Sequence, residues 1–138
     1  MTLDVYKREA LLHNKECIDA YSKNLGIVFA EIKPGMAKAV MQLKKEVVNP
    51  IGSIHGGALF SLADIVAGVA VNANGVNVTT LDSNIQYLAP AFLDRTKTLT
   101  AEATTKKAGK TIHVMEVDIT DDNNTLIASS SFTFFVMR

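Results

Sequence analysis

The chain has 138 residues, and 48% of them are hydrophobic, which is enough for one domain (residues 1–138) with a full apolar core. Its 14 Lys and Arg residues balance its 14 Asp and Glu residues, so the formal net charge is zero. Because no excess of positive charge attracts a phosphate backbone, nucleic acid is not expected as a partner.

The N-terminal segment (residues 3–20) has apolar residues at helical spacing among charged ones, which predicts an amphipathic surface helix. It contains no continuous apolar stretch, so no signal peptide is expected. The single cysteine, Cys17, cannot form an internal disulfide and has no potential metal ligands at a suitable spacing. These features favour a reducing, cytoplasmic location.

Two strands and a loop are predicted next. Residues 25–43 alternate loosely between apolar and polar on either side of Pro34 and Gly35, a pair that suits a tight turn. In residues 46–55, an Asn-Pro pair and an isolated glycine interrupt regular structure, which predicts a loop.

A long helix should follow, beginning at about Gly56 or Gly57. Residues 58–71 are the most apolar stretch, but Asp64 interrupts them and they fall short of the ~20 residues that span a bilayer, so no membrane partner is expected. Beyond the helix, β-branched and aromatic residues predict strands at about 77–88, 96–106, 111–120 and 125–136. Short connections between the later strands indicate hairpins, a mainly antiparallel sheet and an α+β fold.

The beginning of the long helix carries the clearest chemical signal. The first N–H groups of a helix lack intrahelical partners and form the positive end of its dipole, and glycine lets a ligand approach the backbone closely. The Gly56 N–H is therefore a candidate oxyanion donor. Ser53, just upstream, is a candidate capping side chain.

Small and polar residues then form a stripe along one face of this helix: Gly57, Ser61, Asp64 and Gly68. Among these residues Asp64 is the one whose placement costs free energy, because an ionised carboxylate among apolar residues needs hydrogen-bond or charge partners, or a shifted pKa. A plain structural interpretation stays open, in which the glycines make a turn, the aspartate faces solvent and His55 is structural.

The pattern N-P-x-G-x-x-H-G-G-x-x-x-x-L-x-D, residues 49–64, resembles the signature of hotdog-fold acyl-CoA thioesterases of the phenylacetic-acid-degradation (PaaI-like) type. The resemblance continues through "TTLDSNIQYLAPA" and "KKAGKTIHVMEVDI". It implies a hotdog core over residues 23–138, in which a curved antiparallel sheet wraps the long helix. The amphipathic N-terminal segment is expected to form a helix before this core, within residues 1–22. It also implies homodimers with shared active sites, paired into a tetramer.

The resemblance assigns catalytic roles to five residues. Asp64 would be the general base that activates water, or the nucleophile that attacks the thioester. Gly56 and Asn49 would polarise the carbonyl, His55 would position the substrate near its sulfur, and Thr80 would orient the attacking water. Asp64 and Thr80 would face the other three residues across the subunit interface.

Further residues are expected to contact the acyl-CoA substrate. The lysines of "KKAGK" resemble the hairpin that contacts the CoA arm, and the full set is Gly57, Ser61, Ser83, Lys106, Lys107, Gly109 and Lys110. No metal site is predicted, and no cofactor apart from the CoA of the substrate.

Two other functions remain open from the sequence: a hotdog hydratase or dehydratase acting on acyl thioesters, and a non-catalytic acyl-CoA-binding protein. The His-Gly-Gly segment followed by Asp64 argues against the first, because those enzymes use a differently spaced motif. The preferred acyl group cannot be read, since it depends on how residues such as Phe60, Tyr87 and Leu88 shape the pocket.

Overall fold

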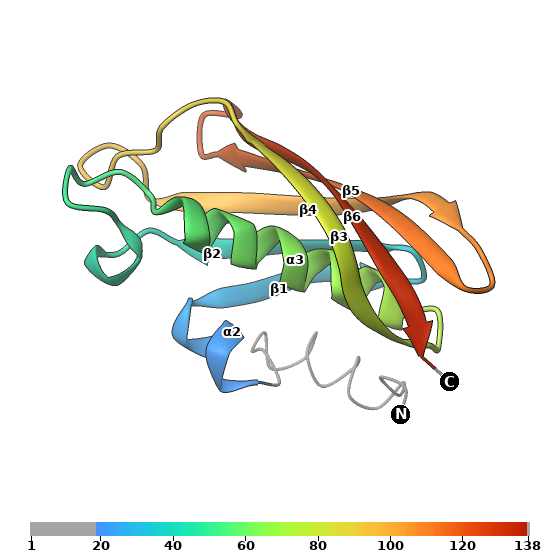
Figure 1. Ribbon diagram of the computed structural model, residues 1–138. Coiled ribbons are helices and arrows are strands. Elements are labelled where there is room, and N and C mark those ends of the chain that lie inside the picture. The colour runs from blue at the N-terminus through green and yellow to red at the C-terminus, as the bar shows by residue number, and fades with distance from the viewer. Residues whose placement is uncertain (1–18, 138) are drawn as a thin grey trace.

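A computed structural model describes residues 19–137, and the elements follow the predicted order (Figure 1). In chain order they are α2 (Ala20–Asn24), β1 (Ile27–Lys33), β2 (Met36–Gln42), the 3-10 helix η1 (Lys45–Val47), α3 (Gly56–Asn72), β3 (Asn77–Tyr87), β4 (Thr98–Ala108), β5 (Ile112–Asp121) and β6 (Leu126–Met137). The predicted long helix and six strands are confirmed, with ends that differ by a few residues. Cys17 and most of the predicted N-terminal helix lie outside the described residues.

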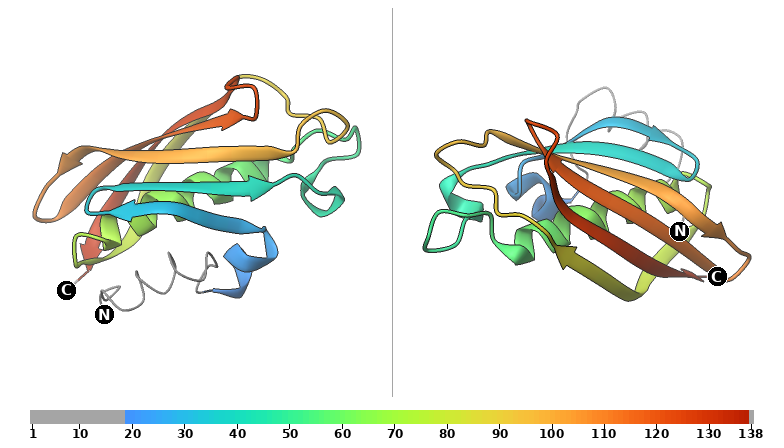
Figure 2. Two further views of the ribbon diagram at one scale, coloured as in Figure 1. Left: turned by 180° about the vertical axis from the view of Figure 1, so that it is seen from behind. Right: turned by 90° about the horizontal axis from the view of Figure 1, so that it is seen from above.

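The six strands form one antiparallel sheet in the order β1-β2-β4-β5-β6-β3. The hairpins predicted between β4, β5 and β6 are present. β3 follows α3 in the chain but does not pair with β2; it crosses to the far edge and pairs with β6 (Figure 2). The long helix makes this crossing possible, because it carries the chain across the concave face of the sheet.

Helix α3 lies against that concave face, and the strands curve around it (Figure 1). Its sheet-facing side is buried and rich in alanine, which lets the helix approach the strands closely: Ala58, Leu59, Leu62, Ala63, Val66, Ala67, Ala70 and Val71. These residues join the inward side chains of β1, β2, β4, β5 and β6 in one apolar core. The core therefore fixes the orientation of α3 and leaves the opposite side of the helix uncovered by these five strands.

The uncovered side carries the predicted stripe of small and polar residues. Gly57 is exposed, and Ser61, Asp64 and Gly68 are partly exposed. These four residues share a face, as the spacing predicted, and Asp64 is half-buried on that face and not enclosed by the core. None of the helices in residues 19–137 is long and apolar enough to cross a membrane.

Candidate active site

Helix α3 begins at Gly56, as predicted, but its cap is not the predicted one. The N-cap residue is His55, whose Nδ1 accepts a 2.8 Å hydrogen bond from the Gly57 N–H. Ser53 is buried instead, and its N–H donates to the Asn49 side chain. Because Nδ1 acts as an acceptor, the His55 ring is neutral in this arrangement and carries its proton on Nε2.

The Gly56 N–H is the unbonded donor of the first turn. Two N–H groups, those of Ala58 and Leu59, donate to the His55 carbonyl oxygen at 3.0 and 3.2 Å, and His55 Nδ1 accepts the N–H of Gly57. The Gly56 N–H bonds to none of the described residues. It shares its peptide group with the doubly bonded His55 carbonyl, and such bonding polarises the amide and strengthens it as a donor.

Asn49 organises the loop before the helix. Its Oδ1 accepts hydrogen bonds from the N–H groups of Ile51 (3.1 Å) and Ser53 (3.0 Å), and its own N–H donates to the Ser53 carbonyl. Oδ1 is therefore committed to the loop backbone. The Asn49 side chain has only its NH₂ group to offer a ligand.

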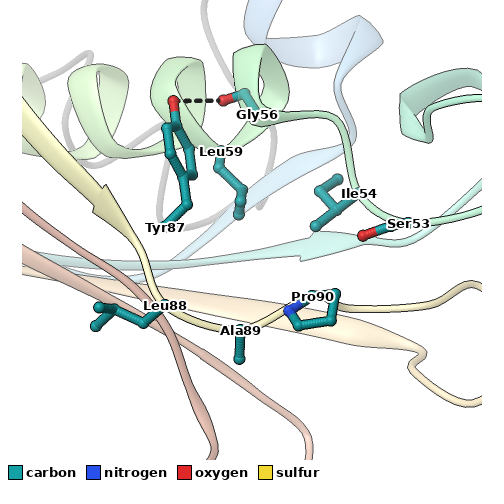
Figure 3. Close-up of a pocket in the computed structure, with 8 residues that line it drawn as sticks. All are labelled: Ser53, Ile54, Gly56, Leu59, Tyr87, Leu88, Ala89 and Pro90. Atoms are coloured by element: carbon teal, nitrogen blue, oxygen red, sulfur yellow. Dashed lines mark hydrogen bonds between the residues drawn. The ribbon is translucent and has the colours of Figure 1, made fainter.

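A cavity of about 290 Å³ adjoins Gly56, between the start of α3 and the end of β3 (Figure 3). It is lined by Ser53, Ile54, Gly56, Leu59, Tyr87, Leu88, Ala89 and Pro90. Apart from Ser53 and the Tyr87 hydroxyl, the side chains are apolar. Tyr87 also donates a 3.1 Å hydrogen bond to the Gly56 carbonyl, a contact that no sequence signal indicated.

Asp64 lies two turns into α3, and Thr80 reaches it from β3. The Thr80 hydroxyl donates a 2.7 Å hydrogen bond to Asp64 Oδ1. This bond links the two residues that the sequence predicted would act together. It also leaves Asp64 Oδ2 available to a water molecule or a substrate.

A β-bulge determines which β3 side chains face the helix. The register of β3 against β6 shifts between Thr80 and Asp82, so that Thr80 pairs with Phe134 and Ser83 pairs with Phe132. Both phenylalanines are buried against the helix side, and directly opposed residues point to the same face of a sheet. Thr80 and Ser83 therefore both face α3, although their odd spacing would place them on opposite faces of a regular strand.

Ser61 is already bonded within the chain. Its hydroxyl donates to the Gly57 carbonyl at 2.9 Å, so the 2.6 Å contact with the Tyr21 hydroxyl must have Tyr21 as donor. This pair attaches α2 to the uncovered side of α3, one turn before Asp64.

The structure does not bring all predicted residues together within one chain. Gly56 and Asp64 are eight residues apart on α3, which corresponds to about 12 Å along the helix axis. A carbonyl held at the Gly56 N–H lies beyond the reach of the Asp64 carboxylate of the same chain. Within one chain the predicted residues therefore form two separate groups, one around Gly56 and one around Asp64, which we call the two half-sites.

The predicted CoA-binding hairpin lies at the other end of α3. At its base the Thr105 hydroxyl donates to the Gly35 carbonyl, and the Gly35 N–H donates to Ala70 near the C-terminus of the helix. Lys106 forms a 3.8 Å ion pair with Glu116. Lys107, Gly109 and Lys110 belong to the same hairpin, and a Cβ at Gly109 would lie 2.7 Å from the Ile112 carbonyl oxygen. Close approach within the hairpin is sufficient to require this glycine.

Within residues 19–137, no group of three or more His, Cys, Asp or Glu side chains is placed to hold a metal ion. The candidate site consists of one carboxylate with its hydroxyl partner, and, separately, a helix N-terminus with an amide and an apolar cavity.

Comparison with known proteins identifies relatives over most of the chain. Residues 51–128 match the family model described as Thioesterase superfamily. The acyl-coenzyme A thioesterase PaaI of Escherichia coli K12 is 34% identical over 110 residues, which is 80% of this chain and 77% of that protein. The solved structure of E. coli PaaI superposes with a TM-score of 0.85 at 27% identity and covers 96% of this chain and 93% of its own.

A hypothetical thioesterase of Streptococcus pneumoniae TIGR4, solved with coenzyme A, is also similar. Its TM-score is 0.77 at 30% identity, covering 80% of this chain and 85% of its own. Two further structures of that protein carry alanine in place of an aspartate and of a threonine, which are sixteen positions apart in its sequence. Asp64 and Thr80 have the same separation here.

Proposed function

Since this chain belongs to the thioesterase superfamily and is a thioester hydrolase with the hotdog fold, we propose that it hydrolyses an aryl-, short- or medium-chain acyl-CoA to the free acid and CoA. One observation supports this substrate most directly. The unbonded Gly56 N–H at the start of α3 adjoins an apolar cavity, so a carbonyl can be polarised while an apolar acyl group leaves water.

In the proposed reaction the Gly56 N–H and the Asn49 NH₂ group hold the thioester carbonyl oxygen. Both donors strengthen their bonds as the oxygen becomes an oxyanion, and one such donor contributes roughly 2.7 to 4 kcal/mol to transition-state stabilisation. His55, neutral with its proton on Nε2, lies beside them and positions the substrate near its sulfur. A thioester carbonyl is already electrophilic, so the proposal needs no metal and no cofactor beyond CoA.

Asp64 acts either as general base or as nucleophile. As a base, Oδ2 takes a proton from water while the water oxygen adds to the carbonyl carbon. Collapse of the tetrahedral intermediate then breaks the C–S bond, and the departing CoA thiolate takes the proton from Asp64, which restores the carboxylate. As a nucleophile, the carboxylate displaces the thiolate and water then hydrolyses the mixed anhydride. In both cases the Thr80 hydroxyl fixes Oδ1, and the matching separation of the replaced aspartate and threonine in the pneumococcal thioesterase is consistent with this pairing.

The separation of Gly56 and Asp64 supports a site shared between two subunits. If two chains pair along their free β3 edges, the antiparallel pairing brings Asp64 of one chain towards Gly56 of the other. We propose this homodimer, two of which form a tetramer. In such an assembly Lys106, Lys107 and Lys110 can attract the CoA phosphates of a substrate held by the partner chain.

Replacing Asp64 by Asn tests the proposed chemistry. Hydrolysis of a panel of aryl-, short- and medium-chain acyl-CoAs, measured as release of free thiol, should fall by about 10²- to 10⁴-fold because the amide cannot accept the proton. Asp82→Asn is the matched control, since Asp82 lies on β3, the strand of Thr80, but faces away from α3. Near-normal turnover by Asp64→Asn would refute the mechanism. A parallel hydration assay with crotonyl-CoA separates hydrolysis from the hydratase alternative.

Subunit mixing tests the shared site. Gly56→Pro removes the N–H at a position that suits proline, because proline is favoured at the first position of a helix and the preceding His55 has the extended backbone (ψ 135°) that proline requires. The added Cβ would meet Tyr87 at an ordinary contact distance of 3.4 to 3.6 Å. Gly56→Pro and Asp64→Asn chains should each be inactive alone. After unfolding and refolding together, random pairing should restore about a quarter of wild-type activity, since each mixed dimer contains one intact site. No recovery would place both half-sites within one chain.

A further inference from the structure

We propose that Tyr87 is a positioning residue for the oxyanion donor, and this inference rests on the proposed function. Tyr87 is the last residue of β3, and its hydroxyl donates a hydrogen bond to the Gly56 carbonyl (Figure 3). The hydroxyl thereby connects the sheet to the residue whose N–H is left free at the start of α3.

A hydrogen bond from outside the helix matters more at the first helical residue than at an interior one. Gly56 has no side chain, its backbone torsions are intrinsically soft, and its N–H has no intrahelical partner. This N–H lies in the His55–Gly56 peptide plane, which is held at the His55 carbonyl. The torsions of Gly56 set how that plane is oriented relative to the next one, so freedom in these torsions spreads the donor over a range of positions. An oxyanion donor is effective only when its direction is fixed before the reaction.

The peptide groups around Gly56 are held in other ways. The His55 carbonyl accepts from two N–H groups of the first turn, and the Gly57 N–H is held by the His55 ring. The Gly56 carbonyl is the group that Tyr87 holds, and among the described residues Tyr87 is the only side chain that bonds to Gly56. In the α-helix the Gly56 carbonyl also accepts the backbone N–H four residues on, so removing the Tyr87 bond weakens the restraint on the C-terminal side of Gly56 without abolishing it.

The Tyr87 ring adds a second restraint. A Cβ placed on Gly56 would lie 3.4 to 3.6 Å from the ring and hydroxyl atoms of Tyr87, so the ring lies beside this face of the glycine and leaves room there for little more than a methyl group. The ring also forms one wall of the cavity. Tyr87 can thus affect catalysis through its hydroxyl and substrate fit through its ring, and a suitable substitution separates the two.

Tyr87→Phe removes the hydroxyl and keeps the ring. With the best acyl-CoA of the panel, we expect kcat to fall about threefold to tenfold, the range for one neutral hydrogen bond, while KM changes less than about twofold. Thr79→Val is the matched control: it removes a hydroxyl from the same strand, and the Thr79 side chain bonds to none of the described residues. This control should keep wild-type kcat and KM.

A spectroscopic measurement reports on the donor directly. In the Asp64→Asn background, the infrared stretch of a ¹³C-labelled thioester carbonyl should move to lower frequency on binding, because the Gly56 N–H polarises the bond. Adding Tyr87→Phe should reduce this shift, whereas adding Thr79→Val should not. A purely structural or pocket-lining role of Tyr87 would leave the shift intact.

The outcomes separate this inference from the proposed function. Hydrolysis by the wild type together with an unchanged kcat for Tyr87→Phe, or a change confined to KM, overturns the positioning role alone. An undiminished infrared shift in the double variant does the same. Absence of acyl-CoA hydrolysis by the wild type overturns the proposed function, and this inference with it.

Discussion

The two edge strands of the sheet, β1 and β3, differ in what they turn towards the helix. β1 has seven residues, and its inward side chains, Ile27, Phe29 and Ile32, are all buried in the core. β3 has eleven residues, none of them buried in the single chain, and it presents Thr80 and Ser83 to the helix side.

This difference shows how the fold separates stability from chemistry. At β1 the sheet ends as a core strand normally does, with apolar side chains covered by the helix. At β3 the sheet ends with hydroxyl groups, an unpaired backbone edge and an exposed Leu81 (60% exposed) at the bulge. A long, uncovered edge invites pairing with another chain. Asp64 therefore faces the strand that contributes least to the core.

The largest expected effect comes from placing a negative charge on each edge strand in turn, because only the charge on β3 should prevent dimerisation. Leu81→Glu puts a carboxylate on the edge that we propose for dimerisation, so we expect the dimer dissociation constant to rise at least about a hundredfold and acyl-CoA hydrolysis to fall with it. Val28→Glu is the matched control, because Val28 is an exposed β1 residue (37% exposed) away from this edge. Sedimentation velocity and turnover measure both effects. Equal dissociation of the two variants would contradict the assignment of the β3 edge.

Removing either of two hydroxyl groups on β3 should have a smaller effect, on kcat in one variant and on KM in the other. Thr80→Val removes the bond to Asp64, so we expect kcat to fall by about tenfold, equivalent to about 1.4 kcal/mol. Ser83→Ala removes a hydroxyl that bonds to none of the described residues, and we expect a rise in KM with little change in kcat. Thermal unfolding of both variants should stay close to wild type. Loss of stability instead of kcat in Thr80→Val would make the bond structural.

Much of this architecture could be predicted from local sequence. Pro34 and Gly35 indicated the first hairpin, and Gly35 does adopt a positive φ of 78°. The glycine pair indicated the start of α3, and the β-branched and aromatic residues after Gly75 indicated the later strands. These features depend on neighbours in the sequence, which is why their positions were right to within a few residues.

Other features depend on contacts between distant segments, and the sequence did not reveal them. Nothing local indicates that β3 crosses to the far edge, or that a bulge at Leu81 turns Thr80 and Ser83 to the same face. Ser53 is a better capping residue by type than His55, yet the loop uses the Ser53 backbone and leaves the cap to the imidazole. The roles of the candidate site residues stay predictions until the variants are measured.

One row across the sheet connects the open edge to the interior. Thr80 on β3 pairs with Phe134 on β6, which pairs in turn with His113 on β5, so all three face the helix side. Thr80 is exposed and bonded to Asp64. His113 is only 6% exposed, and its Nδ1 is buried without a hydrogen-bond partner among the described residues. In this row the polar side chain at the sheet edge has a hydrogen-bond partner. The one two strands further in is buried without a partner, which lowers the stability of the folded chain.

This cost should appear as a pH-dependent loss of stability, the smallest of the expected effects. Burial lowers the pKa of His113 below its ordinary value of 6.5, so the unfolded chain binds this proton more readily than the folded one. The stabilisation is complete above about pH 6.5 and is lost as pH falls towards the folded-state pKa, by at most about 1.4 kcal/mol per pH unit. Urea unfolding of wild type and His113→Leu at pH 7.5, 6.5 and 5.5 measures it. The variant should lose less stability than wild type on acidification, and parallel losses would mean that His113 is not the group responsible.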